Sequence, residues 1–149
     1  MTILRTPKVI AYVTQADRLL VFRQPAFPAA GIQVPAGTLE PGEAPAAGVL
    51  REAREETGIS HLELVAFLGT AEYDMAEFAR AEIQVRHFFH LACEQDTPER
   101  WTHHETGGGK RAEPIEFELF WVRVPHEIPE IIAGQGALLA KLQPSGPHR

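Results

Sequence analysis

Apolar residues return at helical spacing over one segment of the chain, between residues 45 and 57. Four of them fall at positions i, i+3, i+4 and i+7, the pattern of a helix with one face turned to a core: Ala46, Val49, Leu50 and Ala53. Pro45 suits the first helical position, because its missing N–H removes no intrahelical bond, and Gly58 suits a left-handed residue after the last turn. The sequence therefore predicts a helix from Pro45 to Thr57.

Strand patterns flank this helix on both sides. Before it, β-forming residues predict a hairpin of residues 8–14 and 18–23, then a loop that contains Pro25 and Pro28, then a short strand at residues 32–34. After the helix, apolar residues at a period of two predict strands over residues 62–73, 83–91 and 115–121.

The remaining segments are less regular. Residues 95–114 are polar, with few apolar anchors and the run Gly107-Gly108-Gly109, so we expect an exposed, mobile loop. Residues 129–142 place apolar residues on one helical stripe, although Gly134 and Gly136 weaken the prediction of a helix there. The order of elements fits one α/β domain over residues 1–149, a mixed sheet with a helix on each face.

Charge and composition exclude several classes of function. The net charge of -6 argues against binding to long nucleic acids, whose affinity comes largely from basic residues. No apolar run has the length of a membrane span and the N-terminus lacks a signal-peptide layout, so we expect a cytoplasmic protein that does not bind membranes. A single cysteine, Cys93, excludes an internal disulfide framework, and its place in an apolar strand indicates a buried, inert thiol.

The predicted helix carries an unusual concentration of negative charge. Glu52 and Glu56 are one turn apart, with Glu55 beside them. Like charges at this spacing destabilise a helix by about 0.2–0.5 kcal/mol per pair, and the dipole disfavours anions near the C-terminal end. A hard divalent cation would offset this cost. The alternative is a solvated acidic face balanced by Arg51 and Arg54, with Arg51 reaching Glu55 at i+4.

The residues around the helix decide between these alternatives. Seven identities stand at set separations: Gly37, Glu43, Arg51, Glu52, Glu55, Glu56 and Gly58. At ordinary residue frequencies, a chance match at one register is on the order of one in 10⁸. The run from Gly37 to Ile59 resembles the Nudix box, the signature of the Nudix hydrolases, and every fixed position matches.

The resemblance implies an α/β/α sandwich that hydrolyses a diphosphate linked to another moiety, with Mg²⁺ or Mn²⁺ as cofactor. It implies metal binding by Glu52, Glu55, Glu56 and the carbonyl of Ala36, with Arg51 in the same catalytic set. We expect Glu52 and Glu56 to coordinate directly and Glu55 to be a further or water-mediated ligand. Glu43 is either another metal contact or a brace for the loop. The expected partner is a small phosphorylated substrate of the nucleotide class, and a homodimer is one assembly that the resemblance allows.

The other site residues follow less directly. Family members differ in the general base, and the candidates after the box are Glu105, Glu113, Glu116 and Glu118; we prefer Glu116, which begins a strand beside the polar loop. Arg86 is predicted to contact a substrate phosphate, the alternative being an ion pair with a surface carboxylate. Tyr73 is a second candidate substrate contact. Trp101, His103 and His104 either contact the substrate or lie in a solvent-exposed loop.

Two other functions remain open at this stage. One is a nucleotide-binding or sensing module that does not hydrolyse its ligand, and the other is a structural domain that binds a divalent ion. Sensing modules of this kind usually lose box carboxylates, whereas this chain keeps all of them, which favours the enzyme. Nucleoside triphosphates, including oxidised ones, and nucleotide sugars all remain possible substrates.

Overall fold

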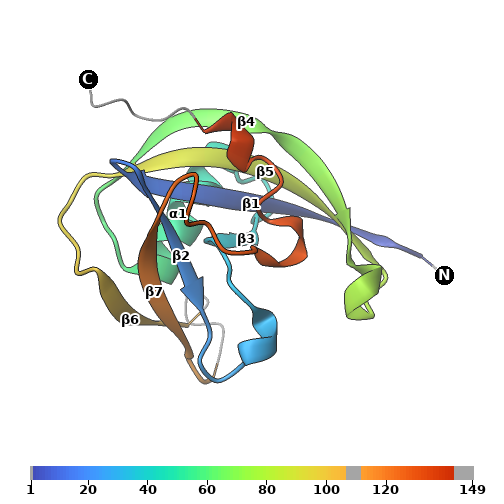
Figure 1. The fold of residues 1–149 in the computed structure, drawn as a ribbon. Helices are drawn as coiled ribbons and strands as arrows, with labels where there is room; N and C mark the ends of the chain where they lie inside the picture. Colours follow the sequence, from blue (N-terminus) through green and yellow to red (C-terminus); the bar gives the residue numbers. More distant parts are fainter. Residues whose placement is uncertain (1, 107–111, 143–149) are drawn as a thin grey trace.

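A computed structural model describes residues 2–106 and 112–142. Its central feature is one mixed sheet in the order β4-β5-β1-β2-β7-β6, with β3 paired to β1 off this path (Figure 1). The strands are β1 (Leu4–Gln15), β2 (Arg18–Arg23), β3 (Ala36–Thr38), β4 (Leu62–Asp74), β5 (Glu82–Cys93), β6 (Arg100–Glu105) and β7 (Ile115–Arg123). The predicted hairpin and the strands of β4, β5 and β7 are therefore confirmed.

β1 pairs with three strands, β5, β2 and β3. It runs parallel to β5 from Leu4 to Thr14 and forms a hairpin with β2 at its far end. At Lys8–Ile10 its other edge is paired with β3 instead, in antiparallel register. The predicted strand at residues 32–34 forms only isolated bridges, Phe22 with Gln33 and Ile32 with Ile131, because the regular pairing begins at Ala36.

The helix α1 (Pro45–Thr57) packs on one face of the sheet, as predicted. Its Val49 and Ala53 are almost completely buried against Val9, Leu91 and Leu119. Pro45 occupies the first turn, and Gly58 has the left-handed φ of 78° that ends the helix. The box segment is thus anchored to the sheet by the apolar side of its helix, which leaves its acidic residues at the margin.

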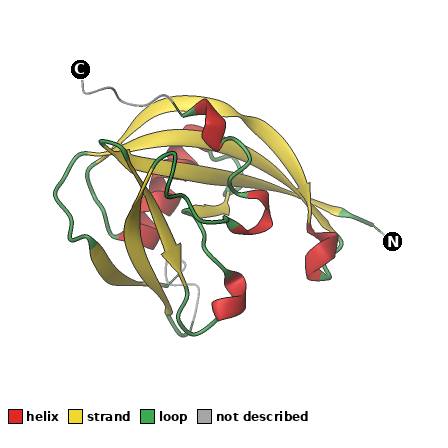
Figure 2. Ribbon diagram, viewed as in Figure 1, coloured by secondary structure: helices red, strands yellow, loops and turns green. Residues whose placement is uncertain are grey.

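The second face of the sheet is covered by the C-terminal segment, which is not the predicted helix. It forms two 3₁₀ turns, η3 (Ile132–Gly134) and η4 (Leu139–Lys141), and the positive φ values of Ala133 and Gly134 interrupt any continuous helix (Figure 2). The Tyr12 hydroxyl donates to the Gln135 carbonyl at 2.6 Å and accepts from the Leu138 N–H at 3.1 Å. The two-sided architecture is therefore confirmed, although the second layer is built from turns.

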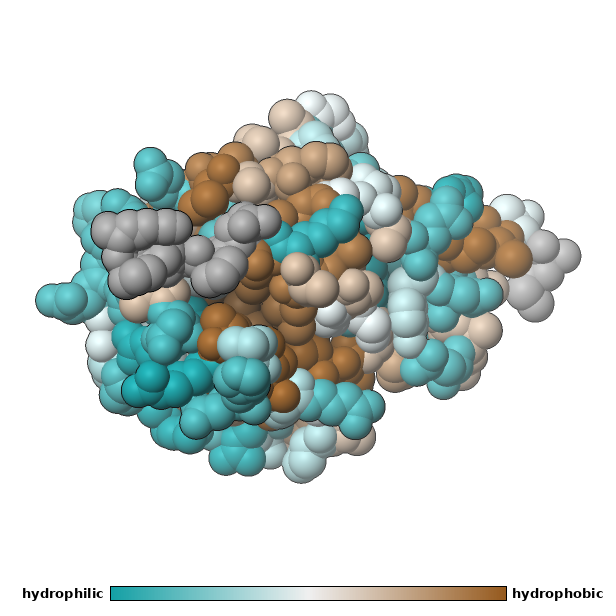
Figure 3. All heavy atoms as spheres, turned by 45° about the horizontal axis from the view of Figure 1, so that its top comes forward, coloured by the Kyte–Doolittle hydropathy of each residue, from teal (hydrophilic) through white to brown (hydrophobic). Residues whose placement is uncertain are grey.

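The apolar residues of this segment still pack on the sheet as the stripe predicted. Ile131, Leu138, Leu139 and Leu142 lie against the core residues Ile10, Tyr12 and Phe88 and remain partly exposed. Apolar side chains accordingly gather near the centre of the face shown in Figure 3, with hydrophilic ones around it. None of the helices in the described ranges is long and apolar enough to span a membrane.

The polar stretch at residues 95–114 was wrongly predicted to be a loop throughout. Residues 100–105 form β6, an edge strand antiparallel to β7. Trp101, His103 and Glu105 alternate with the exposed Thr102 and His104, a period of two that their polarity concealed. Gly107, Gly108 and Gly109 lie outside the described residues.

Candidate active site at the box helix

A bidentate ion pair between Arg51 and Glu43 fixes the loop between β3 and α1 to the helix. Arg51 Nε donates to Glu43 Oε2 and Arg51 Nη2 to Glu43 Oε1, each at 2.8 Å. The Glu40 N–H donates to the same carboxylate at 2.9 Å. The Arg51 hydrogen bonds, followed by that of Glu40, lower the pKa of Glu43 to about 2. Of the two roles considered for Glu43, the geometry supports the brace.

Arg51 also contacts two of the box carboxylates. Its Nη1 lies 2.7 Å from Glu52 Oε2 and 3.6 Å from Glu55 Oε2, so the expected i, i+4 contact with Glu55 is present. Its Nη2 donates to the Thr38 carbonyl at 3.2 Å. One guanidinium thus fixes the loop, the helix and β3 relative to one another.

Glu52 explains why the box begins with glycine. A Cβ atom at Gly37 would lie 2.0 Å from Glu52 Cδ and 2.1 Å from Oε1, so any side chain there would displace the carboxylate. Burial raises the pKa of Glu52, and the charges of Glu55 and Glu105 raise it further, while Arg51 opposes the shift.

Glu56 is held from the other side, at β3. The Ala36 N–H donates to Glu56 Oε1 at 2.9 Å. The residue is partly exposed as a whole, but its carboxyl group is surrounded by protein, and this burial raises its pKa well above the ordinary value; the charges of Glu52 and Glu105 act in the same direction. Ala36 and Glu56, both predicted site residues, are therefore in direct contact.

A fourth carboxylate joins this group from β6. Glu105 is only 5% exposed, and its charge raises the pKa of both Glu52 and Glu56. Glu105 is one of the four candidates for the general base that follow the box, although Glu116 was preferred. The signal that could have selected it is its alternation with Trp101 and His103, which face the same side of β6.

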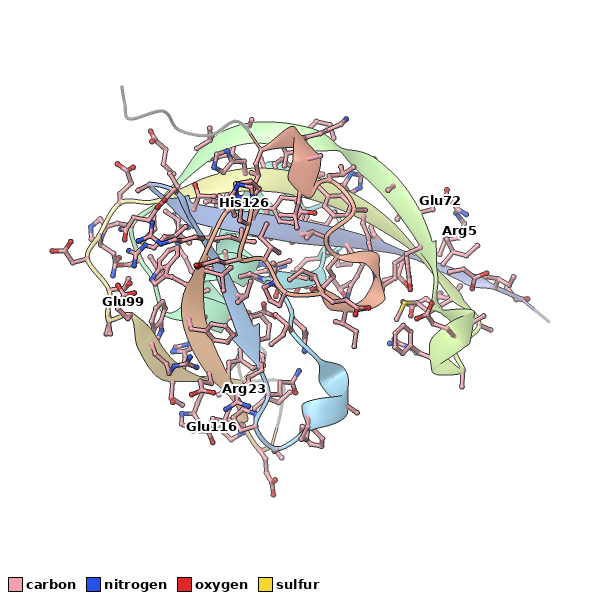
Figure 4. The ribbon with its side chains drawn as sticks, in the orientation of Figure 1. Arg5, Arg23, Glu72, Glu99, Glu116 and His126 are labelled. Carbon is pink, nitrogen blue, oxygen red and sulfur yellow. The ribbon has the colours of Figure 1, made fainter. Side chains whose placement is uncertain are left out.

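The preferred candidate, Glu116, is placed elsewhere. Phe117 and Leu119 of β7 face the core beneath α1, so Glu116 and Glu118 project from the opposite face of the strand. Glu118 pairs with Arg23 and Arg100 there. Figure 4 shows Glu116 beside Arg23. Glu116 therefore does not lie on the side of the sheet that carries the box helix, because the pleat of β7 directs it away.

Arg86 and Tyr73 are brought together, but they hold the C-terminal segment. Arg86 is 3% exposed, its Nη1 donates to the Ala133 carbonyl at 2.6 Å, and its guanidinium stacks on the Tyr73 ring at 4.4 Å from the centroid. A Cβ atom at Gly134 would lie 2.7 Å from the same ring, so Gly134 packs closely on it. The alternative of a surface ion pair does not hold among the described residues, because Arg86 is buried and forms none there, while its phosphate contact stays a prediction.

Trp101 and His103 complete the C-terminal end of α1. Trp101 Nε1 donates to the Thr57 carbonyl at 3.0 Å, and His103 Nε2 lies 2.8 Å from the Glu55 carbonyl. The last carbonyls of a helix lack intrahelical partners, so these contacts satisfy groups that would otherwise need water. The solvent-exposed loop expected for them is a strand, and both side chains fix the helix that carries the acidic residues.

The donor chemistry of this site fits a hard divalent cation. The charges of Glu52, Glu55, Glu56 and Glu105 lie close enough to interact, and burial, followed by this repulsion, raises the pKa values of Glu52 and Glu56. Arg51 forms ion pairs with one oxygen of the Glu52 carboxylate and one oxygen of the Glu55 carboxylate. Within the residues that the structure describes, no three acidic, histidine or cysteine side chains converge closely enough to form a ready-made metal cluster.

Comparisons with known proteins agree with the geometry. The family model described as the NUDIX domain matches residues 4–140. A search of curated proteins found no significant match.

Three solved structures illustrate the similarity of fold. The first is a UDP-X diphosphatase, with a TM-score of 0.64 and 17% identity over 100% of this chain and 66% of that one. A MutT NUDIX hydrolase from Burkholderia pseudomallei has a TM-score of 0.60 and 17% identity, covering 93% of this chain and 98% of its own. A bifunctional NMN adenylyltransferase/ADP ribose pyrophosphatase from Francisella tularensis, complexed with AMP and a Mn ion, has a TM-score of 0.61 and 18% identity, covering 95% and 42%.

These likenesses establish the fold, and the match of the family model over residues 4–140 establishes the family. The chain thus spans 66% of the diphosphatase and less than half of the bifunctional enzyme. The sequence box, the loop–helix geometry and the family model lead to one conclusion: this chain belongs to the NUDIX domain family.

Proposed function

We propose that this protein is a pyrophosphohydrolase that uses a divalent metal ion to cleave the diphosphate of a nucleoside diphosphate linked to another moiety. One observation carries the proposal: the charges of Glu52, Glu55, Glu56 and Glu105 lie within interaction range of one another, and Glu52 lies against a glycine that leaves no room for a side chain. Such a concentration of carboxylates is costly unless a cation neutralises it.

The metal ligands we propose are Glu52, Glu55 and Glu56, with the carbonyl of Ala36 as a further donor from β3. Mg²⁺ or Mn²⁺ bound there would neutralise charge on the phosphate oxygens and polarise the phosphorus toward attack. Arg51 orients Glu52 and Glu55 through its contacts at 2.7 and 3.6 Å, and its bidentate pair with Glu43 keeps it in place.

The chain's own contribution to the chemistry is a proton acceptor in a position protected from solvent. Water attacks one phosphorus, its oxygen forms the new P–O bond, and the bridging P–O bond breaks with its electrons on the leaving phosphate. We propose Glu105 as the carboxylate that takes the proton from water, because it is buried and lies near Glu52 and Glu56. Glu116, expected from the sequence, projects from the other face of β7.

The nucleotide part of the proposal rests on resemblance. The similar structures include a UDP-X diphosphatase and an enzyme complexed with AMP and a Mn ion. The acidic net charge of -6 disfavours long nucleic acids but not a small substrate that arrives with its cation. The substrate contacts expected of Arg86 and Tyr73 stay predictions, and both side chains contact the C-terminal segment.

A panel screen tests this function. Purified protein is incubated with nucleoside triphosphates, dinucleoside polyphosphates, nucleotide sugars and ADP-ribose, with Mg²⁺, with Mn²⁺ or with EDTA, and products are separated by ion-exchange chromatography. We expect hydrolysis at a diphosphate bond of at least one compound, dependent on metal and abolished by EDTA. Binding of nucleotides without hydrolysis of any of them would favour a sensing module, and hydrolysis that persists in EDTA would contradict the metal role.

A further inference from the structure

Lys8 is a positive charge placed inside the sheet, beside the box. It lies on β1 at the point where β3 and β5 flank that strand, with Thr38 and Arg86 as its register partners. Lys8 is half-buried, and it directly precedes the buried apolar run from Val9 to Val13. Lysine is rarely buried without a partner, so its presence here requires an explanation.

The carboxylates around Lys8 attract it but do not pair with it. Burial lowers the pKa of Lys8, and Arg80 adds repulsion. The charges of Glu82 from β5 and of Glu52 and Glu56 from the box oppose this shift and favour the charged form. Its one hydrogen bond among the described residues runs from Nζ to Thr38 Oγ1 at 2.9 Å. None of the ion pairs within the described ranges includes Lys8. Because an ammonium has three N–H donors, two are available for a ligand.

Two further polar atoms lie on the strand face around Lys8 without a hydrogen bond in the described part of the chain. Glu82 is 6% exposed, and its Oε1 has no hydrogen bond of good geometry among the described residues, although Arg80 forms an ion pair with it at 2.9 Å. Thr6 Oγ1 is also buried without a partner in the described part of the chain. Unsatisfied buried groups in a native fold commonly mark a place for water or ligand.

We propose that the Lys8 ammonium binds the phosphate oxygens of a diphosphate substrate held at the box carboxylates. This inference rests on the proposed function and adds a substrate-binding residue to it. Glu52 and Glu56 would hold the metal ion that neutralises one side of a diphosphate, and the Lys8 ammonium on β1 would donate to the remaining anionic oxygens. Charge-assisted hydrogen bonds of this kind favour an anionic diphosphate over neutral ligands.

Lysine variants with a matched control test the proposal. Lys8→Met removes the charge and keeps the aliphatic stem, Lys8→Gln removes the charge and keeps a donor, and Lys8→Arg keeps the charge. Lys141→Met is the control, because Lys141 has a comparable neutral contact, to the Leu68 carbonyl at 3.2 Å, on the C-terminal turn η4. Circular dichroism and thermal melting establish that each variant is folded.

The ligand probe is α,β-methylene-ADP, whose P–C–P bridge is not hydrolysed, titrated calorimetrically in the presence of Mg²⁺. We expect affinity to fall about tenfold or more in Lys8→Met and Lys8→Gln, to recover largely in Lys8→Arg, and to stay unchanged in Lys141→Met. Mn²⁺ binding, followed by electron paramagnetic resonance, should not weaken in any of these variants.

The outcomes separate this inference from the function on which it rests. If the wild type hydrolyses a panel compound and Lys8→Met binds the probe as tightly as wild type, the Lys8 assignment is wrong and the function stands. Loss of Mn²⁺ affinity in parallel with probe affinity would also overturn it, since Lys8 would then act only by positioning the carboxylates. A wild type that neither hydrolyses the panel nor binds the probe would remove both.

Discussion

At the scale of single residues, the site depends on how closely backbone and carboxylates approach one another. Gly37 is required because Glu52 occupies the space of its missing side chain. Glu56 is fixed by one backbone N–H, that of Ala36. The sequence pattern includes these residues in one motif but contains no distances, so it could not distinguish Glu105 from Glu116 as the carboxylate near the box.

The Gly37 contact gives a direct prediction. Gly37→Ala places a methyl group 2.0 Å from Glu52 Cδ, so the carboxylate must move, and a displacement of about 1 Å at a catalytic group costs on the order of 10²-fold in turnover. Steady-state kinetics with a substrate from the panel would measure the loss. Gly42→Ala is the matched control: it has a positive φ of 76° and no atom within 4 Å, so it should lower stability by about 1 kcal/mol and leave turnover intact. Equal turnover in the two variants would disprove the steric argument.

Glu56 gives a second prediction, concerning pH and the metal-free protein. The pKa of Glu56 in the folded protein is raised above the ordinary 4.5, so the protonated carboxyl group contributes stability that is fully present below pH 4.5. This contribution is lost as the pH rises through the folded pKa, because the buried group must then ionise. Glu56→Gln cannot ionise at this position. In EDTA, the free energy of unfolding of the wild type should therefore fall relative to Glu56→Gln from pH 4.5 upward, as measured by urea unfolding. A difference that does not change with pH would count against a buried, uncompensated carboxylate.

At the scale of elements, β6 and the C-terminal turns are where sequence and structure diverge. The helix α1 could be predicted to the residue because Pro45, Gly58 and its apolar spacing are local signals. β6 could not, because its residues are ordered by contacts distant in sequence, such as Trp101 with Thr57 and His103 with Glu55. The C-terminal segment has helical spacing, but Ala133 and Gly134 bend it where Arg86 and Tyr73 hold it.

The role of β6 in ending the helix leads to a stability prediction. Trp101→Phe keeps an aromatic ring at this position but removes the N–H that donates to the Thr57 carbonyl. Thr57 is only 1% exposed. An unsatisfied buried acceptor costs about 1–3 kcal/mol, so the urea midpoint should decrease without a change in m-value. His104→Ala, on the exposed side of the same strand, should change stability by about 0.5 kcal/mol or less. A Trp101→Phe midpoint equal to that of the wild type would show that water replaces the indole.

At the scale of the whole molecule, the sheet brings together carboxylates from segments far apart in the chain. The parallel pairing of β1 with β5, which the sequence does not specify, places Lys8 beside Arg86, while β3 aligns Ala36 with Glu56. The order of strand and helix patterns was enough to predict a mixed sheet covered on both sides. It was not enough to predict which edge strand completes the site, since that depends on the antiparallel pairing of β6 with β7.

The most direct measurement combines metal binding and hydrolysis in the same samples of wild type and Glu56→Gln. Mn²⁺ is titrated and followed by electron paramagnetic resonance, and hydrolysis of the compound found in the panel is measured at each concentration. We predict that the wild type binds Mn²⁺ and that its activity rises with occupancy, whereas folded Glu56→Gln binds the ion weakly and loses turnover by several orders of magnitude. Wild-type turnover in Glu56→Gln at saturating metal, or a wild type that hydrolyses without binding Mn²⁺, would contradict the account.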